Sequence, residues 1–293
     1  MEQALGVQDM KIRPIQLNAE HLELYSALLN NCFPDTPPNR RKLSIASLAW
    51  LYKENPDGMA LGFDAFDKDQ LVAHYVCIPA NILGTDGPLR ALLSLNTATL
   101  PSYQGRGLFT QLAQATFEAA KQLEFDCVYG VANQNSTSGF VQNLGFTLVA
   151  PLQVMLGIGR LEPLRLDLPL QFQRSWSPAS LSWRCANPAN PLRISNLFDK
   201  SVVVARTDFP GVCAYAELFG NIVTNSSPTW SSHKLKLKLV LGLFPQGLPA
   251  SYFKIPDFLK PAPLNFIFKS LQPLTPIPKR ESVHFTFLDF DAY

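Results

Sequence analysis

The sequence LLSLNTATLPSYQGRGLFT, residues 92–110, joins an apolar run, a glycine turn and the start of a helical pattern. The run stops at Pro101, the turn contains Gly105 and Gly107, and the helical pattern opens at about Leu108. A turn between a strand and a helix N-terminus presents free backbone N–H groups, which bind phosphate well. Glycine lets the main chain approach a ligand that any Cβ would hold off. We therefore predict a pyrophosphate site at this turn.

The segments after the turn alternate between helix and strand. A helical pattern covers Phe109–Leu123, a short apolar strand covers Asp126–Ala132, and a second short helix covers about Thr137–Asn143. Gly145 suits the C-cap of that helix because glycine adopts the left-handed conformation found there. Two other nucleotide motifs are excluded, since the chain has no GxxxxGKS or GxxxxGKT and the turn lacks the three glycines of GxGxxG.

This block resembles the acyl-CoA-binding core of the GNAT superfamily of N-acetyltransferases, and the resemblance covers roughly residues 11–155. That family carries Q/R-x-x-G-x-G/A on the turn, an Asn after the next strand and a Gly-Phe pair after the following helix. Gln104, Gly107, Asn133 and Gly145-Phe146 stand at these positions. The resemblance therefore implies an acyl-CoA site built around the turn.

Composition indicates a compact protein of about two domains. The chain has 293 residues, of which 47% are hydrophobic and 16% are charged, and this excludes a disordered chain. The net charge of +2 gives no general attraction to nucleic acid. No apolar run approaches ~20 residues, and the N-terminus lacks the pattern of a signal peptide. The five cysteines are scattered without zinc spacing, so we expect free thiols in a reducing cytoplasm and no metal.

The region before the turn completes the order of elements. We predict a strand at Lys11–Gln16, a helix capped by Asn18, a second helix at about Arg40–Lys53, and a hairpin formed by Met59–Phe66 and Leu71–Leu83. Together with the later segments this gives the order β-α-α-β-β-β-α-β-α-β. That order is the one found in the GNAT family.

The composition shifts after Ala150, because sixteen of the 24 prolines fall at or beyond Pro151. We interpret Leu161–Pro178 as a crossover linker. Further strands and one helix are predicted at Leu192–Asn196, Ser201–Arg206, Val212–Leu218, Lys234–Leu243, Leu264–Leu271 (the helix) and Val283–Tyr293. The pieces that resemble the second half of tandem GNAT proteins are Trp183-Arg184, Asn187-Pro188 and Leu288-Asp289-Phe290-Asp291.

These patterns predict an α/β fold in two halves. Residues 1–160 would form an acyl-CoA-binding GNAT domain, with a mixed, mostly antiparallel, splayed sheet flanked by helices. Residues 161–293 would form a second, smaller, degenerate GNAT-like α/β half on the acceptor side. That half has no second glycine turn, so only the first half is expected to bind a cofactor.

The resemblance implies how acetyl-CoA, or another acyl-CoA, would bind. Its pantetheine arm would pair with the backbone near Thr99 and Leu100, and its pyrophosphate would sit on the N–H groups of Gly105–Thr110. Gln104 would order the loop or meet a phosphate, and Arg106 would add a charge-assisted contact or remain solvated. The implied cofactor-binding residues are Thr99, Leu100, Gln104, Gly105, Arg106, Gly107, Leu108, Phe109, Thr110, Asn133 and Ser136.

Three of these residues have an alternative structural role. Phe109 replaces the small residue that usually ends the turn motif, and it either packs into the core or crowds the phosphates. Because it continues the apolar stripe of the helix, we expect the core. Asn133 and Ser136 either face the cofactor arm or cap their own turn.

The usual catalytic acid of the family is missing. Many members place a Tyr four residues before the Gly-Phe pair, and here that position is Val141. Tyr129 on the neighbouring strand is a substitute acid or half-buried packing. His74 has a suitable pKa range but stands on a strand, where a lone histidine is usually structural. Asn96 on the preceding strand can form hydrogen bonds but cannot take a proton at neutral pH.

The closing strand Val283–Tyr293 offers a candidate base. Alternation puts Phe285, Phe287, Asp289 and Asp291 on one face, so the two carboxylates follow the phenylalanines to the rim of the core. Partial desolvation there would raise the pKa values of both carboxylates, as a base requires. The alternative is a frayed terminus in water. The candidate catalytic residues are Asp291, Asp289 and Tyr129.

We therefore expect an acyl-CoA-dependent N-acyltransferase, most simply an N-acetyltransferase, acting on a primary amine of a small molecule such as an amino sugar or amino acid. Transfer would be direct, within a ternary complex. The expected partners exclude nucleic acid and membrane, a homodimer is left open, and the expected location is the cytoplasm. Two alternatives are a tRNA-dependent aminoacyl transferase, which the absent basic stripe disfavours, and a non-catalytic ligand-binding protein on a decayed fold.

Overall fold

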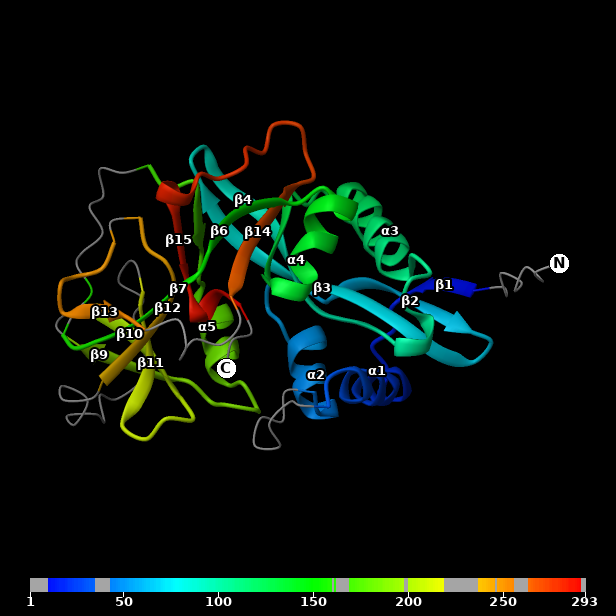
Figure 1. The fold of residues 1–293 in the computed structure, drawn as a ribbon, viewed down its shortest axis with the longest axis horizontal. Coiled ribbons are helices and arrows are strands. Elements are labelled where there is room, and N and C mark those ends of the chain that lie inside the picture. The colour runs from blue at the N-terminus through cyan, green and yellow to red at the C-terminus, as the bar shows by residue number, and fades with distance from the viewer. Residues whose placement is uncertain are drawn as a thin grey trace.

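One sheet of fifteen strands runs through the described chain (Figure 1). The computed structural model describes residues 10–34, 43–159, 161, 169–197, 200–218, 237–245, 247–255 and 263–290. Its α-helices are α1 (Ala19–Cys32), α2 (Ile45–Lys53), α3 (Leu108–Gln122), α4 (Gln134–Ser138) and α5 (Pro178–Cys185). Its strands are β1 (Met10–Pro14), β2 (Leu61–Asp67), β3 (Gln70–Gly84), β4 (Gly87–Thr99), β5 (Cys127–Asn133), β6 (Thr147–Pro151), β7 (Gln153–Gly157), β8 (Phe172–Arg174), β9 (Arg193–Leu197), β10 (Lys200–Arg206), β11 (Val212–Glu217), β12 (Leu237–Leu243), β13 (Tyr252–Lys254), β14 (Leu264–Ser270) and β15 (Val283–Thr286).

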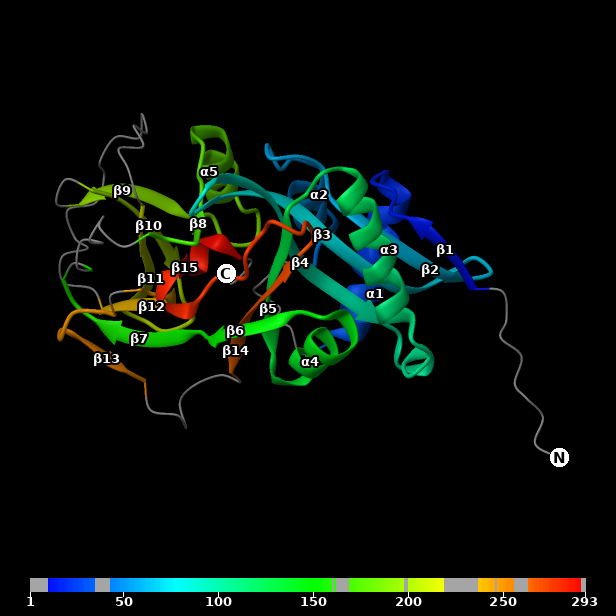
Figure 2. The same ribbon diagram turned by 90° about the horizontal axis from the view of Figure 1, so that it is seen from above.

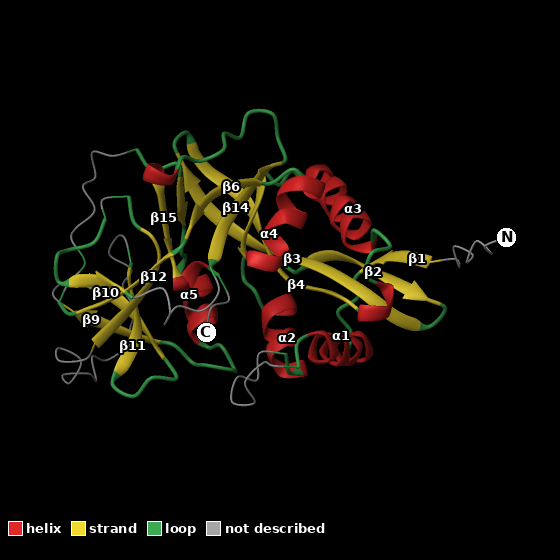
Figure 3. Ribbon diagram, viewed as in Figure 1, coloured by secondary structure: helices red, strands yellow, loops and turns green. Residues whose placement is uncertain are grey.

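The first half of the sheet carries helices on both faces. Its strands run in the order β1–β2–β3–β4–β5–β14–β6, and β4 and β5 are parallel while the other neighbours are antiparallel. Helices α1 and α2 cover one face, and α3 and α4 cover the other (Figures 1 and 3). Tyr25 and Leu48 belong to the core on the first face, and Leu112 and Phe117 belong to the core on the second. The predicted α/β fold with a mixed, mostly antiparallel sheet is confirmed.

Local sequence explains where the helices begin. Asn18 Oδ1 accepts a hydrogen bond from the His21 N–H at 2.9 Å, which caps α1 as predicted. Ser44 caps α2 in the same way, so that helix begins at Ile45. Residues 40–42 of the predicted second helix lie outside the described residues.

The strand β4 parts from β5 part-way along its length. Paired residues run from Ala91↔Cys127 to Ser94↔Gly130 and stop there, although both strands continue. On the other side of β4, the register with β3 shifts so that Tyr75 stands opposite two residues, Asn96 and Thr97. Asn96 has a φ of 47°, a left-handed conformation that Asn tolerates better than most residues. This bulge lies where β4 turns away from β5, while β14 stays paired along the other edge of β5 from Cys127 to Asn133.

The two halves of the chain exchange strands (Figure 2). β14 comes from late in the chain but lies between β5 and β6. β7 directly follows β6, yet it pairs with β12 among the strands of the second half. There β11 and β12 are parallel neighbours, as β4 and β5 are in the first half. The predicted linker Leu161–Pro178 contributes β8, which pairs with β3 and β15.

The helix predicted at Leu264–Leu271 is wrong, because this segment forms the strand β14. Its side chains alternate between the two cores: Phe266 and Phe268 pack on the α1–α2 side, and Ile267 packs on the α3 side. All three are exposed by 1% or less. A strand buried on both faces is a continuous apolar run, which periodicity alone cannot distinguish from a buried helix.

The strand predicted at Val283–Tyr293 is correct only as far as Thr286. A 3₁₀ turn then covers Phe287–Asp289, and reciprocal hydrogen bonds between Thr286 and Asp289 close it. Asp289 is therefore folded back onto the chain and does not follow the phenylalanines to a rim. Asp291 lies outside the described residues.

Among the described residues, no helix is long and apolar enough to cross a membrane. Within the same residues, no group of three or more His, Cys, Asp or Glu side chains is arranged to hold a metal ion. The five cysteines are free thiols, of which Cys77, Cys127 and Cys213 are buried.

The strand exchange predicts that the core of the first half depends on β14. Ile267→Ala should lower the free energy of unfolding by about 2–5 kcal/mol, because it leaves a cavity against α3. Leu274→Ala is the control, since that side chain is 95% exposed and its loss should change stability by less than about 0.5 kcal/mol. Urea unfolding followed by circular dichroism measures both. Equal effects of the two substitutions would contradict the placement of β14.

Candidate functional site

The N-terminus of α3 presents its backbone N–H groups without a cap. Gly107 precedes the helix with φ 74°, and within the described chain no side chain caps this end. The first main-chain hydrogen bond of the helix runs from Gln111 N–H to Gly107 O at 3.0 Å, so the amides before Gln111 have no helical partner. Gly105 is also left-handed, at φ 76°, and no protein atom lies within 4 Å of the Cβ position it lacks. The space beside the turn is open to a ligand.

The main chain at the end of β4 is already engaged. Gln104 Nε2 donates to Thr99 O at 3.2 Å, which fixes the loop, and Leu100 N–H donates to the β3 backbone at 2.9 Å. Burial raises the pKa of the Cys32 thiol, and a hydrogen bond with the Thr99 backbone opposes that shift. Thr99 and Leu100 therefore already have protein partners where the resemblance placed the pantetheine arm. The edge of β4 that has parted from β5 begins earlier, at Leu95.

Arg106 is held beside the glycine turn. Its Nη2 donates to Ser102 O at 3.1 Å, and its guanidinium lies 4.6 Å from the centre of the Tyr103 ring. Tyr103 in turn donates its hydroxyl to Asp67 at 2.7 Å. A guanidinium has five N–H donors, so this anchoring leaves donors for an anion on the turn.

Phe109 packs into the core, as the apolar stripe of the helix predicted. Its ring makes edge contacts with Tyr75 at 6.1 Å and Phe140 at 5.2 Å between centroids. The bulky residue at the end of the turn motif therefore leaves the space over the turn free.

Asn133 and Ser136 form a local cap at the start of α4. Asn133 Oδ1 accepts the Ser136 N–H at 3.0 Å, and Ser136 Oγ donates to the same oxygen at 3.1 Å. Their side chains satisfy each other, which is the turn-capping alternative. Both residues lie beyond Gly130 along the chain, past the last residue of β5 that pairs with β4.

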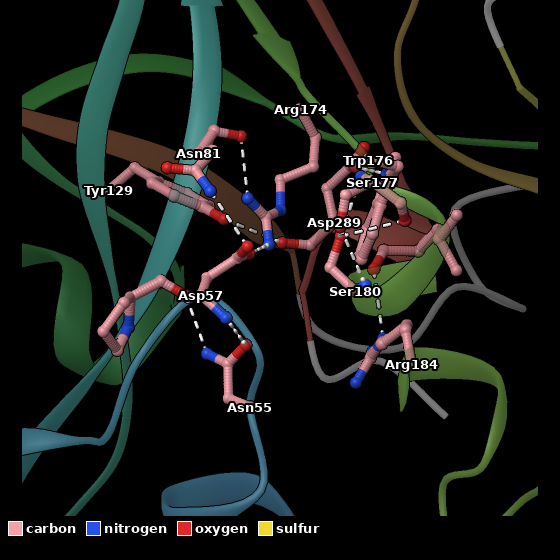
Figure 4. A network of polar contacts seen from close by, with 12 residues as sticks. Asn55, Asp57, Asn81, Tyr129, Arg174, Trp176, Ser177, Ser180, Arg184 and Asp289 are labelled. Atoms are coloured by element: carbon pink, nitrogen blue, oxygen red, sulfur yellow. Dashed lines mark hydrogen bonds and ion pairs between the residues drawn. The ribbon is translucent and has the colours of Figure 1, made fainter. Parts of the chain in front are cut away.

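Tyr129 and Asp289 meet at the junction of the two halves, away from solvent (Figure 4). Tyr129 is fully buried, donates its hydroxyl to Asp289 O at 3.2 Å, and has a pKa that burial raises. Asp289 Oδ2 accepts the Thr286 N–H at 2.6 Å, and its Oδ1 accepts from Trp176 Nε1 at 3.2 Å. Both residues hold the junction together through these hydrogen bonds. Burial raises the pKa of Asp289, as the sequence argument expected of a base. The roles of Tyr129 as acid and Asp289 as base stay predictions.

The same junction contains a buried ion pair. Arg174 Nη2 pairs with Asp57 Oδ2, and its Nη1 donates to Asn81 O at 2.7 Å. Asn81 Nδ2 donates to Asp57 Oδ1 at 2.9 Å, and the guanidinium lies over the Trp176 ring (Figure 4). Asp57 and Asn81 belong to the first half and Arg174 to the predicted linker, so this network fastens the halves together.

Two tryptophans form a second contact between the halves. Trp50 of α2 and Trp183 of α5 stack with ring centres 4.8 Å apart. Each donates its indole N–H to the backbone oxygen of the other at 3.0 Å. Both buried indole N–H groups therefore have a hydrogen-bond acceptor.

A cavity of about 150 Å³ also lies at the junction and not at the parted strands. Arg174, Glu217, His284 and Asp289 line it. Burial lowers the pKa of His284 to about 3. The charged groups that line this cavity form hydrogen bonds or ion pairs within the protein. We therefore assign the cavity to the contact between the two halves.

Comparison with known proteins agrees with the geometry of the turn. Residues 11–149 match the sequence profile of the acetyltransferase (GNAT) domain. The chain contains a GNAT domain. No curated protein matches the chain by sequence.

Solved structures resemble the chain beyond this GNAT domain. A probable N-acyltransferase from Enterococcus faecalis is 10% identical with a TM-score of 0.57, covering 90% of this chain and 73% of its own. Eis1 from Mycobacterium abscessus is 11% identical with a TM-score of 0.58, covering 90% and 74%. A putative acetyltransferase from Pyrococcus horikoshii is 13% identical with a TM-score of 0.53, covering 92% of each chain. At these identities the likeness concerns the fold.

A buried chain of polar side chains crosses the GNAT domain and ends at the bulge of β4. His74 Nδ1 lies 2.6 Å from Asp64 Oδ1, and His74 Nε2 lies 3.4 Å from the Tyr52 hydroxyl. Asn96 Nδ2 donates to that hydroxyl at 3.0 Å. On the other side, Tyr25 donates to Asp64 Oδ2 at 2.7 Å. Sequence reasoning treated His74 as a lone histidine and missed this chain.

Counting along the hairpin does not reveal this pair. The turn pairs Asp67 with Gln70 and Phe66 with Leu71, so a regular register would place Ala73 opposite Asp64. A register shift between Ala65 and Phe66 brings His74 opposite Asp64 instead, and the sequence pattern gives no signal for that shift.

The surroundings of Asp289 predict a specific dependence of stability on pH. Burial raises the pKa of Asp289 to about 6 from 3.8, against the opposing hydrogen bonds from Thr286. Between pH 4 and 6 the folded protein therefore holds a proton that the unfolded chain has released, so this group makes stability fall as pH rises. The loss should be roughly 1–3 kcal/mol. It should be absent in Asp289→Asn.

Urea unfolding of the wild type and of Asp289→Asn from pH 4 to 7 measures this difference. The lowered pKa of His284 acts in the opposite direction, but equally in both proteins, so it cancels in the comparison. Identical pH slopes would contradict the raised pKa.

Proposed function

We propose that this protein is an acyl-CoA-dependent N-acyltransferase, most simply an N-acetyltransferase, acting on a primary amine of a small molecule. The observation that carries the proposal is the uncapped N-terminus of α3 beside the parted strands β4 and β5. The GNAT profile over residues 11–149 supports the same activity.

The glycine turn suits the pyrophosphate of a CoA thioester. The free N–H groups at the start of α3 can each donate to a phosphate oxygen, and the helix dipole contributes about 0.3–1 kcal/mol, or more in a partly buried site. The anchored Arg106 adds a positive charge next to them. The extended pantetheine arm would then run along the edge of β4 from Leu95, where β5 no longer pairs.

The reaction would need no covalent enzyme intermediate. The neutral amine attacks the thioester carbonyl carbon, the new C–N bond forms and the C–S bond breaks. The amine nitrogen loses one proton and the CoA sulfur gains one, so the products are an amide and CoA thiol. The thioester would lie where the strands part, near Ser94 and Gly130.

One observation favours a second candidate, a protein that binds acyl-CoA without transferring the acyl group. The family's usual acid position is Val141, and the substitute candidate Tyr129 is fully buried. This candidate predicts acyl-CoA binding without release of CoA in the presence of any amine.

Gly107→Glu should weaken acetyl-CoA binding about 10–100-fold, because a carboxylate would occupy the pyrophosphate position. Gly211→Glu is the matched control: Gly211 has φ 78°, against 74° for Gly107, and open space around it. Both substitutions should cost about 1–2 kcal/mol of stability through the left-handed backbone. Only the first should affect binding measured by calorimetry.

Acetyl-CoA binding that is unchanged in Gly107→Glu would remove the pyrophosphate site from this turn. Release of CoA thiol with glucosamine, lysine and spermidine then decides between transfer and binding alone. The wild type should release CoA with at least one of these amines.

A further inference from the structure

The side chain of Asn96 occupies a special position in the GNAT domain. It lies two residues beyond the last β4–β5 pair, Ser94↔Gly130, at the place where the strands part. The bulge leaves both Asn96 and Thr97 opposite Tyr75, and the φ of 47° at Asn96 is unfavourable for most side chains. Asn96 is partly exposed, whereas the other members of its polar chain are buried.

The contacts orient each side chain of this polar chain. His74 Nδ1 lies 2.6 Å from Asp64 Oδ1, which holds the imidazole ring between Asp64 and Tyr52. Asn96 Nδ2 donates to the Tyr52 oxygen at 3.0 Å, so the NH₂ end of Asn96 faces Tyr52. The Tyr52 hydroxyl also lies 3.4 Å from His74 Nε2, which links Asn96 to the buried pair.

The outer end of this polar chain is the carbonyl oxygen of Asn96. With Nδ2 turned to Tyr52, the carbonyl oxygen Oδ1 of Asn96 is left for a donor, and no described residue donates to it in the structure. Asp64, His74 and Tyr52 are exposed by 1%, 0% and 0%. Burying three such groups costs free energy that an apolar core would not cost, so a role in orienting Asn96 gives them a reason to be there.

We propose that Asn96 Oδ1 accepts a hydrogen bond from the acceptor amine, and that Tyr52, His74 and Asp64 are positioning residues that hold the Asn96 amide in that orientation. This inference rests on the proposed function, since it places the amine beside the thioester. An amide carbonyl oxygen accepts hydrogen bonds, and a neutral primary amine offers it two N–H donors. An amine held by one N–H can direct its lone pair at the thioester carbon.

This assignment leaves the bonds and protons of the chemical step unchanged. The amine nitrogen forms the C–N bond, the C–S bond breaks, and the proton released by nitrogen ends on the CoA sulfur. Asn96 takes no proton and gains no charge. It therefore affects how the amine is placed, and not how acetyl-CoA binds at the α3 turn.

Tyr52→Phe tests the positioning role, because it removes the hydroxyl that links Asn96 to His74 and keeps the ring. With acetyl-CoA and whichever of glucosamine, lysine or spermidine the wild type acetylates, kcat/KM for the amine should fall about tenfold. The acetyl-CoA Kd should stay within about twofold. Asn96→Gly suits the left-handed backbone and removes only the side chain, so it should lose at least as much.

Tyr252→Phe is the matched control. Tyr252 is also buried, its hydroxyl donates to Gly159 O at 3.2 Å, and it lies on β13, which pairs with β7 in the other half of the sheet. If the polar chain serves only stability, Tyr52→Phe and Tyr252→Phe should lower the melting temperature and kcat/KM alike, and that result would overturn the inference. An unchanged kcat/KM in Asn96→Gly would also overturn it. If the wild type releases no CoA with any of the three amines, the proposed function fails first and the inference with it.

Discussion

The parting of β4 from β5 is the constraint on which the rest of the structure depends. A parallel pair of strands would normally continue as far as both strands do, but here the pairs end at Ser94↔Gly130. The extra residue at Asn96–Thr97 lies where β4 turns aside, while the other edge of β5 stays paired with β14 along its whole length. Backbone edges left apart in this way can accept an extended ligand. The uncapped start of α3 lies at the end of the same strand, so one local irregularity brings both parts of an acyl-CoA site together.

The second half of the chain acts on this site through the fold. It supplies β14 to the first half of the sheet, and β7 from the first half of the chain pairs with its strand β12. Arg174, Trp183 and Asp289 form hydrogen bonds and an ion pair that hold the junction together. The buried donors and acceptors of Tyr129 and Asp289 form hydrogen bonds there, as buried polar groups require. In the first half, the polar chain from Asp64 to Asn96 ends beside the parting strands, where we propose that it places the amine.

Sequence was sufficient wherever the deciding interactions are local. The glycine turn, the cap of α1 by Asn18 and the inward stripe containing Phe109 all follow from neighbours within a few residues, and the structure has them as predicted. It was insufficient where partners are distant. β14 is a strand because β5 and β6 stand on either side of it, and Asp289 turns inward because Thr286 and Trp176 donate to it. No periodicity within those segments contains that information.

A crystal structure of the protein grown with acetyl-CoA would test this acyl-CoA site most directly. We expect the pyrophosphate on the amides of residues 105–110, the pantetheine arm along β4 from Leu95, and the thioester beside Ser94 and Gly130. Acetyl-CoA bound in the cavity at the junction, or lying away from the glycine turn, would contradict it.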